Sequence, residues 1–475
     1  MLRDRYEPSD VLALFPAPGM ELDPVLTQID GLLDNDTLFQ AIRADLAIRH
    51  PHTLTDGRPS TPVEVIVRML TIKHLYGWSY ELTCELVALR LVLRQFCRVY
   101  AQAVPTDTTL LRWANLIRPA TLHELHDRVV DLACQRKVTH GRKLRIDGTV
   151  VETNIHERVD STLLGDGVRV LTRSILRAKM LFGKDAPVNR AAFRNRSGSV
   201  RRVMKRLIDA ARRRGEAAAE ALHQQYRQLI DLSCQVLQQA QVVQVALAQQ
   251  THERAQRLGT TLQTFIGRVR QVIAQTRRRV LQGQQVSAGE KLASMFEPHT
   301  AIIGRGKPGK PTELGRVVWL SEVDGGIISR YVILEGNPDD ATQLEPSLEH
   351  HIQRFGQSPQ LLVADGKLAT PTNEQLAQRR GVRRVVLPKA GPKGSTRKAY
   401  ERQRWFQRGR DWRAGIEGLL SGLKRRHKLE RCLYHGDAGM ERWVGWGIIS
   451  HNLRMIAQRL VDRKKRLTVH TGFAA

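Results

Sequence analysis

Apolar residues recur with a helical period along the first third of the chain. After Thr61-Pro62 they lie three and four residues apart as far as Leu75 and stop at Gly77, which predicts a helix with Thr61 as its N-cap. Ser79 begins a second such segment, and residues 105–107 begin a third. Three short helices with tight turns predict a helix-turn-helix-like DNA-binding domain, and a bundle with solvated arginines is the alternative. The arginines concerned are Arg90, Arg94, Arg98 and Arg112.

The pattern changes near residue 141 to short β-branched or alternating segments, which predict strands. Asp324-Gly325-Gly326 separates two of them and predicts a hairpin turn. Amphipathic helices are predicted between the later strands, over about 341–354 and 373–379. The predicted strands cover residues 143–154, 316–323, 327–334, 360–364 and 383–388.

Residues 165 to 290 return to a helical pattern that is rich in Ala, Gln and Arg, as in a long helical hairpin. The order of elements therefore predicts an α/β fold whose mixed sheet is interrupted by a large helical insertion and preceded by an all-helical domain. The predicted parts are a flexible tail (1–22), the DNA-binding domain (23–140), the first part of the catalytic domain (141–164), the basic insertion (165–295), the second catalytic part (296–435), and a C-terminal helix and tail (436–475).

The charge of the chain bears on its partners. Its 75 Lys and Arg against 47 Asp and Glu give a formal net charge of +28 over 475 residues, which favours nucleic acid as the partner. The first residues contain no apolar signal region, and no apolar run approaches the length of a membrane span. Five scattered cysteines without a C-x-x-C pair are typical of a reducing compartment. We therefore expect a cytoplasmic protein that does not bind membranes; the resemblance described below further implies a bacterial, nucleoid-associated one.

Two acids on predicted strands are each followed by a glycine. Asp147 is followed by Gly148, and Asp365 ends the strand at 360–364 and is followed by Gly366. Either pair alone could be a simple turn. Acids at the ends of neighbouring strands can instead share a divalent cation, because open sheets bind ligands at strand carboxyl ends.

A third acid lies on a predicted helix near the C-terminal end. Arg413, Glu417 and Lys424 are spaced so that all three share one helix face. The alternative is a surface ion pair four residues apart. Together with Asp147 and Asp365, Glu417 would supply hard oxygen ligands for Mg²⁺ or Mn²⁺, and the two cations would hold phosphates.

Basic and aromatic residues alternate just before this helix face. Lys389 and Lys393 lie in the loop 389–398, and Arg410 follows in the helix. With Tyr400, Trp405 and Trp412 among them, these residues predict contacts with DNA, and a solvated face with core tryptophans is the alternative.

Other polar residues carry weaker predictions. Asp324 is expected in its turn for backbone reasons, Asp339 and Asp340 are expected to cap a helix, and the pair His350-His351 is expected on a solvated face. The remaining acids near the first strand are Glu152, Asp160 and Asp166, of which the last two are minor candidates for supporting the site.

Taken together, these motifs resemble the DDE transposases of bacterial insertion sequences, and the ISNCY type is the most similar. The similarity runs from about residue 25 to 460, and one departure is Arg410, where the family often has a tyrosine. The matching segments are 57–62, 76–79, 105–109, 146–156, 161–172, 363–366 and 413–424.

The resemblance implies an RNase H-like catalytic fold with an insertion, magnesium dependence, and catalytic acids at Asp147, Asp365 and Glu417. Such a transposase would bind terminal inverted repeats, cleave at element ends and join the 3′ ends to target DNA, as at least a dimer. In related transposases an insert often lies between the second acid and the Glu, whereas this one lies before Asp365, so its role is not transferred. The alternatives are a structure-selective metal-dependent DNA nuclease and a catalytically silent DNA-binding protein.

Overall fold

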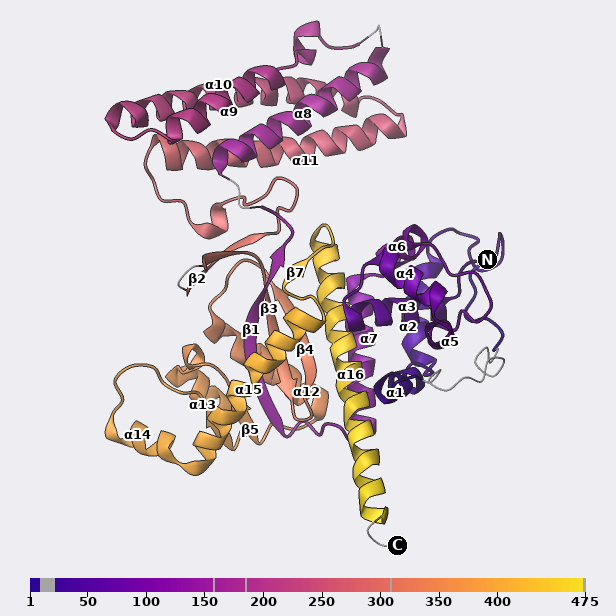
Figure 1. Cartoon of the computed structure of the whole chain (residues 1–475). Helices are drawn as coiled ribbons and strands as arrows, with labels where there is room; N and C mark the ends of the chain where they lie inside the picture. Colours follow the sequence, from indigo (N-terminus) through magenta and orange to yellow (C-terminus); the bar gives the residue numbers. More distant parts are fainter. Residues whose placement is uncertain (9–21, 157–158, 184–185, 308–309, 473–475) are drawn as a thin grey trace. The chain divides into compact units, whose positions relative to one another are not determined.

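The computed structural model in Figure 1 describes residues 1–8, 22–156, 159–183, 186–307 and 310–472. The chain forms two compact units, Met1–Asn154 with Arg316–Ala475, and Ile155–Gly315. The described part holds helices α1 to α16 and one mixed sheet, which confirms the predicted α/β class, although the chain is mostly helical. The second unit contains the predicted insertion and is wider than the predicted 165–295 at both ends.

Helices α1 to α7 form the N-terminal part of the first unit within the residues that the structure describes. Ser79 caps α4 by accepting the Leu82 N–H (3.0 Å), and Thr106 caps α6 through the Thr109 N–H (3.3 Å). The prediction for α3 was wrong by one residue, because Pro62 is its N-cap and no side chain caps it. The helices are α1 (Pro24–Leu32), α2 (Thr37–Ala47), α3 (Val63–Tyr76), α4 (Tyr80–Leu89), α5 (Leu91–Phe96), α6 (Asp107–Leu116) and α7 (Pro119–Gln135).

The first residues of the chain do not form the flexible tail that the sequence predicted. The Leu2 N–H donates to the Thr53 carbonyl (2.6 Å), the Val63 N–H donates to the Arg3 carbonyl (3.0 Å), and the Leu2 side chain is buried. The start of the chain is therefore bonded to the loop before α3. The rest of the predicted tail includes residues 9–21, which lie outside the described residues.

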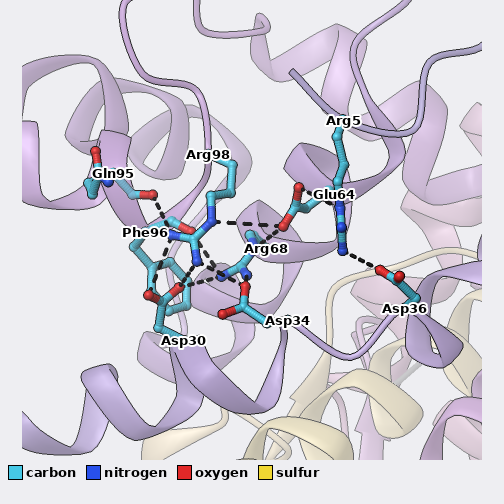
Figure 2. Close-up of polar contacts among 9 residues, drawn as sticks. All are labelled: Arg5, Asp30, Asp34, Asp36, Glu64, Arg68, Gln95, Phe96 and Arg98. Carbon is cyan, nitrogen blue, oxygen red and sulfur yellow. Dashed lines mark hydrogen bonds and ion pairs between the residues drawn. The ribbon is translucent and has the colours of Figure 1, made fainter. Parts of the chain in front are cut away.

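A buried ionic cluster joins α1, α3 and the turn after α5 (Figure 2). Arg68 is fully buried and donates to Glu64 Oε1 (3.0 Å), Asp30 Oδ1 (2.5 Å) and Asp34 Oδ1 (2.6 Å). It also donates to the Phe96 carbonyl (3.2 Å), so every guanidinium nitrogen has a partner. Such complete pairing is what a charge needs in order to be stable inside a protein.

Two of the arginines that the sequence predicted as DNA contacts form bonds within this domain instead. Arg98 pairs with Asp34 (2.9 Å) and Asp30 (3.1 Å) in the same cluster. Arg94 donates to the backbone carbonyls of Tyr100 (2.7 Å) and Gln102 (2.5 Å). Neither is a solvated side chain on a bundle surface either, so both predicted alternatives fail for these two. Arg90 and Arg112 remain exposed.

The sheet of the first unit has the order β4-β3-β1-β5-β6, and β7 pairs with β1. The β3–β4 pair is antiparallel, whereas β1–β5, β5–β6 and β1–β7 are parallel. The predicted hairpin is present, and Asp324 in its turn also accepts the N–H groups of His140 (2.9 Å) and Arg142 (2.7 Å), which fixes the entry into β1. The strands are β1 (Lys143–Thr153), β3 (Lys310–Val323), β4 (Ile327–Leu334), β5 (Leu361–Val363), β6 (Arg384–Val386) and β7 (Arg431–Cys432).

Helices cover both faces of this sheet. On one face, Trp319 of β3 donates to Ser347 of α12 (3.0 Å). On the other face, Val318 and Leu320 pack in one apolar cluster with residues of α16, which also packs along α1, α3 and α7 (Figure 1). The later helices are α12 (Leu344–Phe355), α13 (Pro371–Arg379), α14 (Ser395–Arg402), α15 (Arg404–Arg426) and α16 (Asp437–Gly472), with short 3-10 turns at Asp340–Gln343 and Gly366–Leu368. Within the described ranges, none of the helices combines the length and the apolar character that crossing a membrane requires.

The second unit is a helical bundle with its own apolar core. Its two longest helices, α10 and α11, form the predicted hairpin, and α8 and α9 pack against them. Outside the bundle, β2 pairs antiparallel with the first residues of β3. The elements are α8 (Asp160–Phe182), α9 (Ser197–Ala211), α10 (Glu216–Ala248), α11 (Glu253–Thr276), 3-10 turns at Arg190–Phe193 and Ala288–Glu290, a π turn at Arg277–Leu281, and β2 (Ala301–Lys307).

Three buried histidines support the first unit in their neutral form. His351 donates to the Gly141 carbonyl (3.0 Å), His427 to the His74 carbonyl (3.1 Å) and His451 to the Gly326 carbonyl (3.1 Å). Burial lowers the pKa of His351 and of His451 to about 4, and that of His427 to about 3. The predicted solvated face for His350-His351 was therefore wrong, since His351 is buried.

We expect the unfolding free energy of the protein to fall as pH drops from about 6.5 to about 4. In that window the unfolded chain binds protons at these histidines and the folded chain does not, and each unit of pKa depression corresponds to about 1.4 kcal/mol. Urea unfolding at stepped pH measures the loss. The variant His351→Asn should flatten the slope, whereas His52→Asn, at an exposed position, should not. An equal slope in both variants would contradict this account.

Candidate active site at the ends of strands β1 and β5

Asp147 and Asp365 occupy equivalent positions on neighbouring parallel strands. β1 pairs with β5 in the register Lys143↔Leu361 to Arg145↔Val363, and each aspartate lies two residues beyond the last pair. Neighbouring strands lie about 4.8 Å apart, so the register brings the two acids to the same edge. β1 continues past Asp147 to pair with β7, so Asp147 lies inside its strand, within the predicted segment 143–154, whereas Asp365 follows the end of β5.

The glycines after both acids are needed for space. A Cβ at Gly148 would lie 2.9 Å from the ring of Trp319, and a Cβ at Gly366 would lie 2.5 Å from the Pro388 carbonyl oxygen. Neither glycine has a positive φ. In each pair the glycine N–H donates to the preceding carboxylate, at 2.8 Å for Asp147 and 2.7 Å for Asp365. Glycine is therefore needed after each aspartate because the backbone packs closely against its neighbours there, and not because the backbone adopts a left-handed turn conformation.

Negative charge accumulates at this edge of the sheet. Burial raises the pKa of Asp147, and the carboxylates of Asp365 and Asp340 raise it further, against the opposing effects of the Gly148 N–H and the Arg413 guanidinium. Asp340 lies in the turn before α12 and pairs with Lys367 (3.5 Å). The sequence predicted a helix cap at 339–340, and the Asp339 side chain does accept the Ala341 N–H (3.0 Å).

Arg413 brings helix α15 to the two strand ends. Its Nη2 lies 2.9 Å from Asp365 Oδ1, and the Asp365 side chain keeps 41% of its surface exposed. The buried Nε of Arg413 has no hydrogen-bond partner among the described residues. The guanidinium stands beside an accessible carboxylate and is suited to binding a phosphate oxygen through its Nη groups, since the buried Nε is out of reach of a ligand.

A second arginine fixes α15 on the sheet beneath the site. Arg145 of β1 is buried, forms a two-pronged pair with Glu322 of β3 (2.5 and 2.7 Å), and donates to the Trp412 carbonyl of α15. Its guanidinium also lies 2.8 Å from where a Cβ of Gly415 would stand. Since side chains alternate along a strand, Asp147 lies on the same face of β1 as Arg145 and so faces α15.

Glycines at two places let α15 approach the sheet this closely, and Gly409 gives the sharper test. A Cβ there would lie 2.6 Å from Val386 Cγ2, whereas nothing lies within 4 Å of a Cβ at Gly422 in the same helix. We expect Gly409→Ala to lower the unfolding free energy by about 1–3 kcal/mol through overpacking. Gly422→Ala should raise it by about 0.5–1 kcal/mol. Urea unfolding compares the two, and Gly409→Ala at least as stable as Gly422→Ala would contradict this packing.

Glu417 lies one helical turn beyond Arg413 and is exposed. The face predicted for Arg413 and Glu417 therefore exists on a real helix, and Lys424 lies two turns farther on. Within the described residues, no three His, Cys, Asp or Glu side chains come close enough together to hold a metal ion. The structure thus brings together Asp147, Asp365 and Arg413. Glu417 does not lie close enough to the two aspartates to share a metal ion with them.

The basic residues of the loop 389–398 and of the helix after it, which the sequence predicted as DNA contacts, differ in whether they are paired within the protein. Lys393 Nζ lies 2.5 Å from Glu401 Oε2, and Arg397 pairs with the same carboxylate at 2.8 Å. Burial alone would raise the pKa of Glu401, but these bonds outweigh it and lower that pKa to about 2. Lys393 is thus engaged in holding the loop, while Lys389 and Arg410 are exposed. The DNA-binding prediction for all three stays a prediction.

The aromatic residues of this segment form part of a core. Tyr400, Trp405 and Trp412 pack around Phe406 and Val386. The ring of Trp412 also lies under the Arg145 guanidinium, 4.9 Å from it. This packing corresponds to the alternative of core tryptophans.

The minor acid candidates have structural roles elsewhere. Asp160 accepts from Gln275 and Arg279, both at 2.9 Å, and Asp166 pairs with Arg169 (2.8 Å), all within the second unit. Glu152 pairs with Arg431 (2.9 Å). The suggestion that Asp160 and Asp166 support the site therefore fails, because their charges are used inside the helical bundle.

Comparison with known proteins bears on the helical domain. Residues 18–116 match a sequence family described as a transposase domain, DUF772. This match supports a transposase family and suggests a DNA-processing enzyme with a function in transposition. No curated protein and no solved structure matches the chain.

Proposed function

We propose that the protein is a DDE transposase, of the ISNCY type, that cleaves DNA at the ends of an insertion sequence and joins the 3′ ends to target DNA. The observation that carries the proposal is the register of β1 and β5, which puts Asp147 and Asp365 side by side with Arg413 against them. The transposase-domain match in residues 18–116 supports it independently, since none of those three residues lies in the match.

The catalytic part, on this proposal, is an RNase H-like sheet interrupted by a helical insertion between β1 and β3. A mixed sheet with acids on two adjacent parallel strands and a third acid on a helix packed over them supports that assignment. Ligand sites of open α/β sheets lie at the carboxyl ends of parallel strands, where Asp365 stands.

The acids fit a hard divalent cation, Mg²⁺ or Mn²⁺. Asp147 and Asp365 supply carboxylate oxygens at one edge, and the charge of Asp365 and Asp340 raises the pKa of Asp147, a repulsion that a cation would relieve. Asp147 and Asp365 would hold the metal, with Glu417 joining them when DNA is bound. When bound, the metal would activate the attacking oxygen and stabilise the leaving oxygen of an in-line displacement.

The substrate would be double-stranded DNA, as terminal inverted repeats and as target. The net charge of +28 supports a polyanionic partner, and the exposed Lys389 and Arg410, with Arg413 and Lys424, lie on or near α15 as candidate phosphate contacts. Pairing of two element ends would require at least a dimer. We place this activity in the bacterial cytoplasm, at the nucleoid.

The experiment is incubation of labelled DNA carrying the native element ends, together with a target plasmid, with and without Mg²⁺. We expect metal-dependent nicks at the element ends and covalent joining to the plasmid, both lost with EDTA and in Glu417→Gln. Cutting without joining would replace the proposal with a structure-selective nuclease. Binding without cutting by the wild type would replace it with a DNA-binding protein.

A further inference from the structure

A cavity of about 1030 Å³ lies in the first unit beyond the C-terminal end of α15. Its walls come from the turn between α3 and α4, from α6, and from the segment that leads from α15 through β7 to α16. Its volume is in the range of ligand pockets. None of the residues so far placed at the strand ends lines it, but Lys424 does.

A buried lysine faces this cavity, and none of the described carboxylates pairs with it. Lys73 is 3% exposed, and its Nζ lies 4.5 Å from the ring centre of Tyr80 and 5.3 Å from those of Tyr434 and Trp443. Burial lowers the pKa of Lys73 to about 8, and no carboxylate opposes that effect. The rings compensate part of the charge through their negative faces. A buried ammonium with three donors still favours an anion in the cavity beside it.

Most of the charged side chains that line the cavity are positive, as Lys73 is. Glu430 is the one acid among the described residues that line the cavity. An anionic ligand therefore meets a positive field from several sides. The cations are Lys73, Lys424, Arg425, Lys428, Arg431 and Arg442.

The cavity also offers flat apolar surface. Trp78 and Tyr80 are half-buried at its wall, and the Tyr80 hydroxyl is bonded to the Tyr434 hydroxyl (2.6 Å). Leu433 adds an exposed apolar side chain. Aromatic rings beside cations suit a ligand with both a planar ring and a phosphate, which is the chemistry of a nucleotide.

Helix α15 connects the cavity to the acids. Lys424 follows Glu417 by two turns, which is about 10 Å along the axis. That distance corresponds to about three base-pair steps along the axis of a DNA duplex, and to fewer nucleotides of an extended single strand. A strand whose phosphate lies at the acids can therefore reach the cavity with a nucleotide a few positions away.

We propose that this cavity binds an unpaired nucleotide of the DNA strand held at the active site, with its phosphate at Lys73 and its base against Trp78 and Tyr80. A duplex cannot enter, because a paired base is stacked on both faces, so the site selects a frayed or single-stranded end. The assignment rests on the proposed function, since it takes the strand to lie along α15. A free nucleotide has the same chemistry and is the competing source.

The test compares binding of two duplexes that carry the element end, one blunt and one with a short single-stranded overhang, in the presence of Ca²⁺ to prevent cutting. We expect the wild type to bind the overhang duplex about tenfold more tightly or better. Lys73→Met and Trp78→Ala should each remove most of that preference and leave blunt-duplex binding unchanged. Lys465→Met, an exposed lysine outside the cavity, is the matched control and should keep it.

Each outcome decides the proposal. No overhang preference in the wild type overturns it, as does a preference kept in both variants. If circular dichroism shows that Lys73→Met is unfolded, Trp78→Ala decides alone. Micromolar binding of thymidine monophosphate without an overhang preference would assign the cavity to a free nucleotide and overturn the DNA assignment.

The same DNA substrates and variants distinguish failure of the cavity proposal from failure of the proposed transposase activity. Metal-dependent cutting and joining with no overhang preference would overturn the cavity alone. An overhang preference that depends on Lys73 and Trp78, without any cutting, would overturn the transposase activity alone.

Discussion

Replacing Asp147 or Asp365 with Asn is expected to reduce DNA cleavage by about a thousandfold or more, with DNA binding retained. Each substitution keeps the size of the side chain and removes the charge that would hold the metal. Loss of a metal ligand removes several kcal/mol of transition-state stabilisation, and each 1.36 kcal/mol is a factor of ten in rate. Glu417→Gln should reduce cleavage to the same extent, although Glu417 is exposed on α15, one helical turn beyond Arg413.

The matched control for these variants is Asp411→Asn. Asp411 is an exposed acid on the same helix, outside the Arg413 and Glu417 pair. It should keep cleavage at close to the wild-type rate. Initial rates of nicking and gel-shift affinities for the same DNA measure both quantities. Wild-type cleavage by any of the three candidate variants would remove that residue from the catalytic set.

Replacing Arg68 with Met is expected to lower the unfolding free energy by about 3–5 kcal/mol. The change takes from Glu64, which is itself buried, and from the half-buried Asp30 the closest cation of each, and leaves them the longer contacts with Arg5 (3.3 Å) and Arg98 (3.1 Å), respectively. Removing one partner of a buried ion pair costs this much because the buried charge that remains loses its best hydrogen bonds. In the cluster of Figure 2, Arg68 is the fully buried cation that bonds to acids of both α1 and α3.

An exposed pair provides the control for Arg68. Arg43 pairs with Asp4 (2.6 Å), and both side chains are exposed, so Arg43→Met should cost about 1 kcal/mol or less. Urea unfolding of both variants at neutral pH gives the comparison. The double variant Arg68→Met, Glu64→Gln should recover part of the loss. Equal stabilities of the two single variants would show that the buried cluster contributes no more than a surface pair.

Local patterns in the sequence were sufficient to predict much of the fold. The caps at Ser79 and Thr106 depend on side chains within a few residues of the backbone groups that they bind, and the turn of the hairpin depends on the positive φ angles of Gly325 and Gly326. Helix α15 is present over the predicted face of Arg413 and Glu417. The placement of Asp147 beside Asp365 follows from the parallel pairing of β1 with β5; the sequence predicted that the two acids lie on neighbouring strands but not the register of those strands.

Long-range partners were not visible in local patterns. Arg98 is a surface-like arginine by its neighbours in sequence, yet its partners Asp30 and Asp34 lie more than 60 residues away. His351 is buried because it bonds to Gly141, 210 residues away. The pairing of Arg145 with Glu322, which lies 177 residues away and fixes α15 beneath the two aspartates, had no local signal either.

The metal site at Asp147 and Asp365 can be tested by titrating the full chain, in complex with element-end DNA, with Mn²⁺ and measuring the bound ion by electron paramagnetic resonance. We expect the wild type to bind Mn²⁺ and Asp147→Asn and Asp365→Asn each to weaken this binding by about tenfold or more, in step with the loss of cleavage. Asp411→Asn should bind as the wild type does. Unchanged Mn²⁺ affinity in both strand-end variants would contradict a metal site at Asp147 and Asp365.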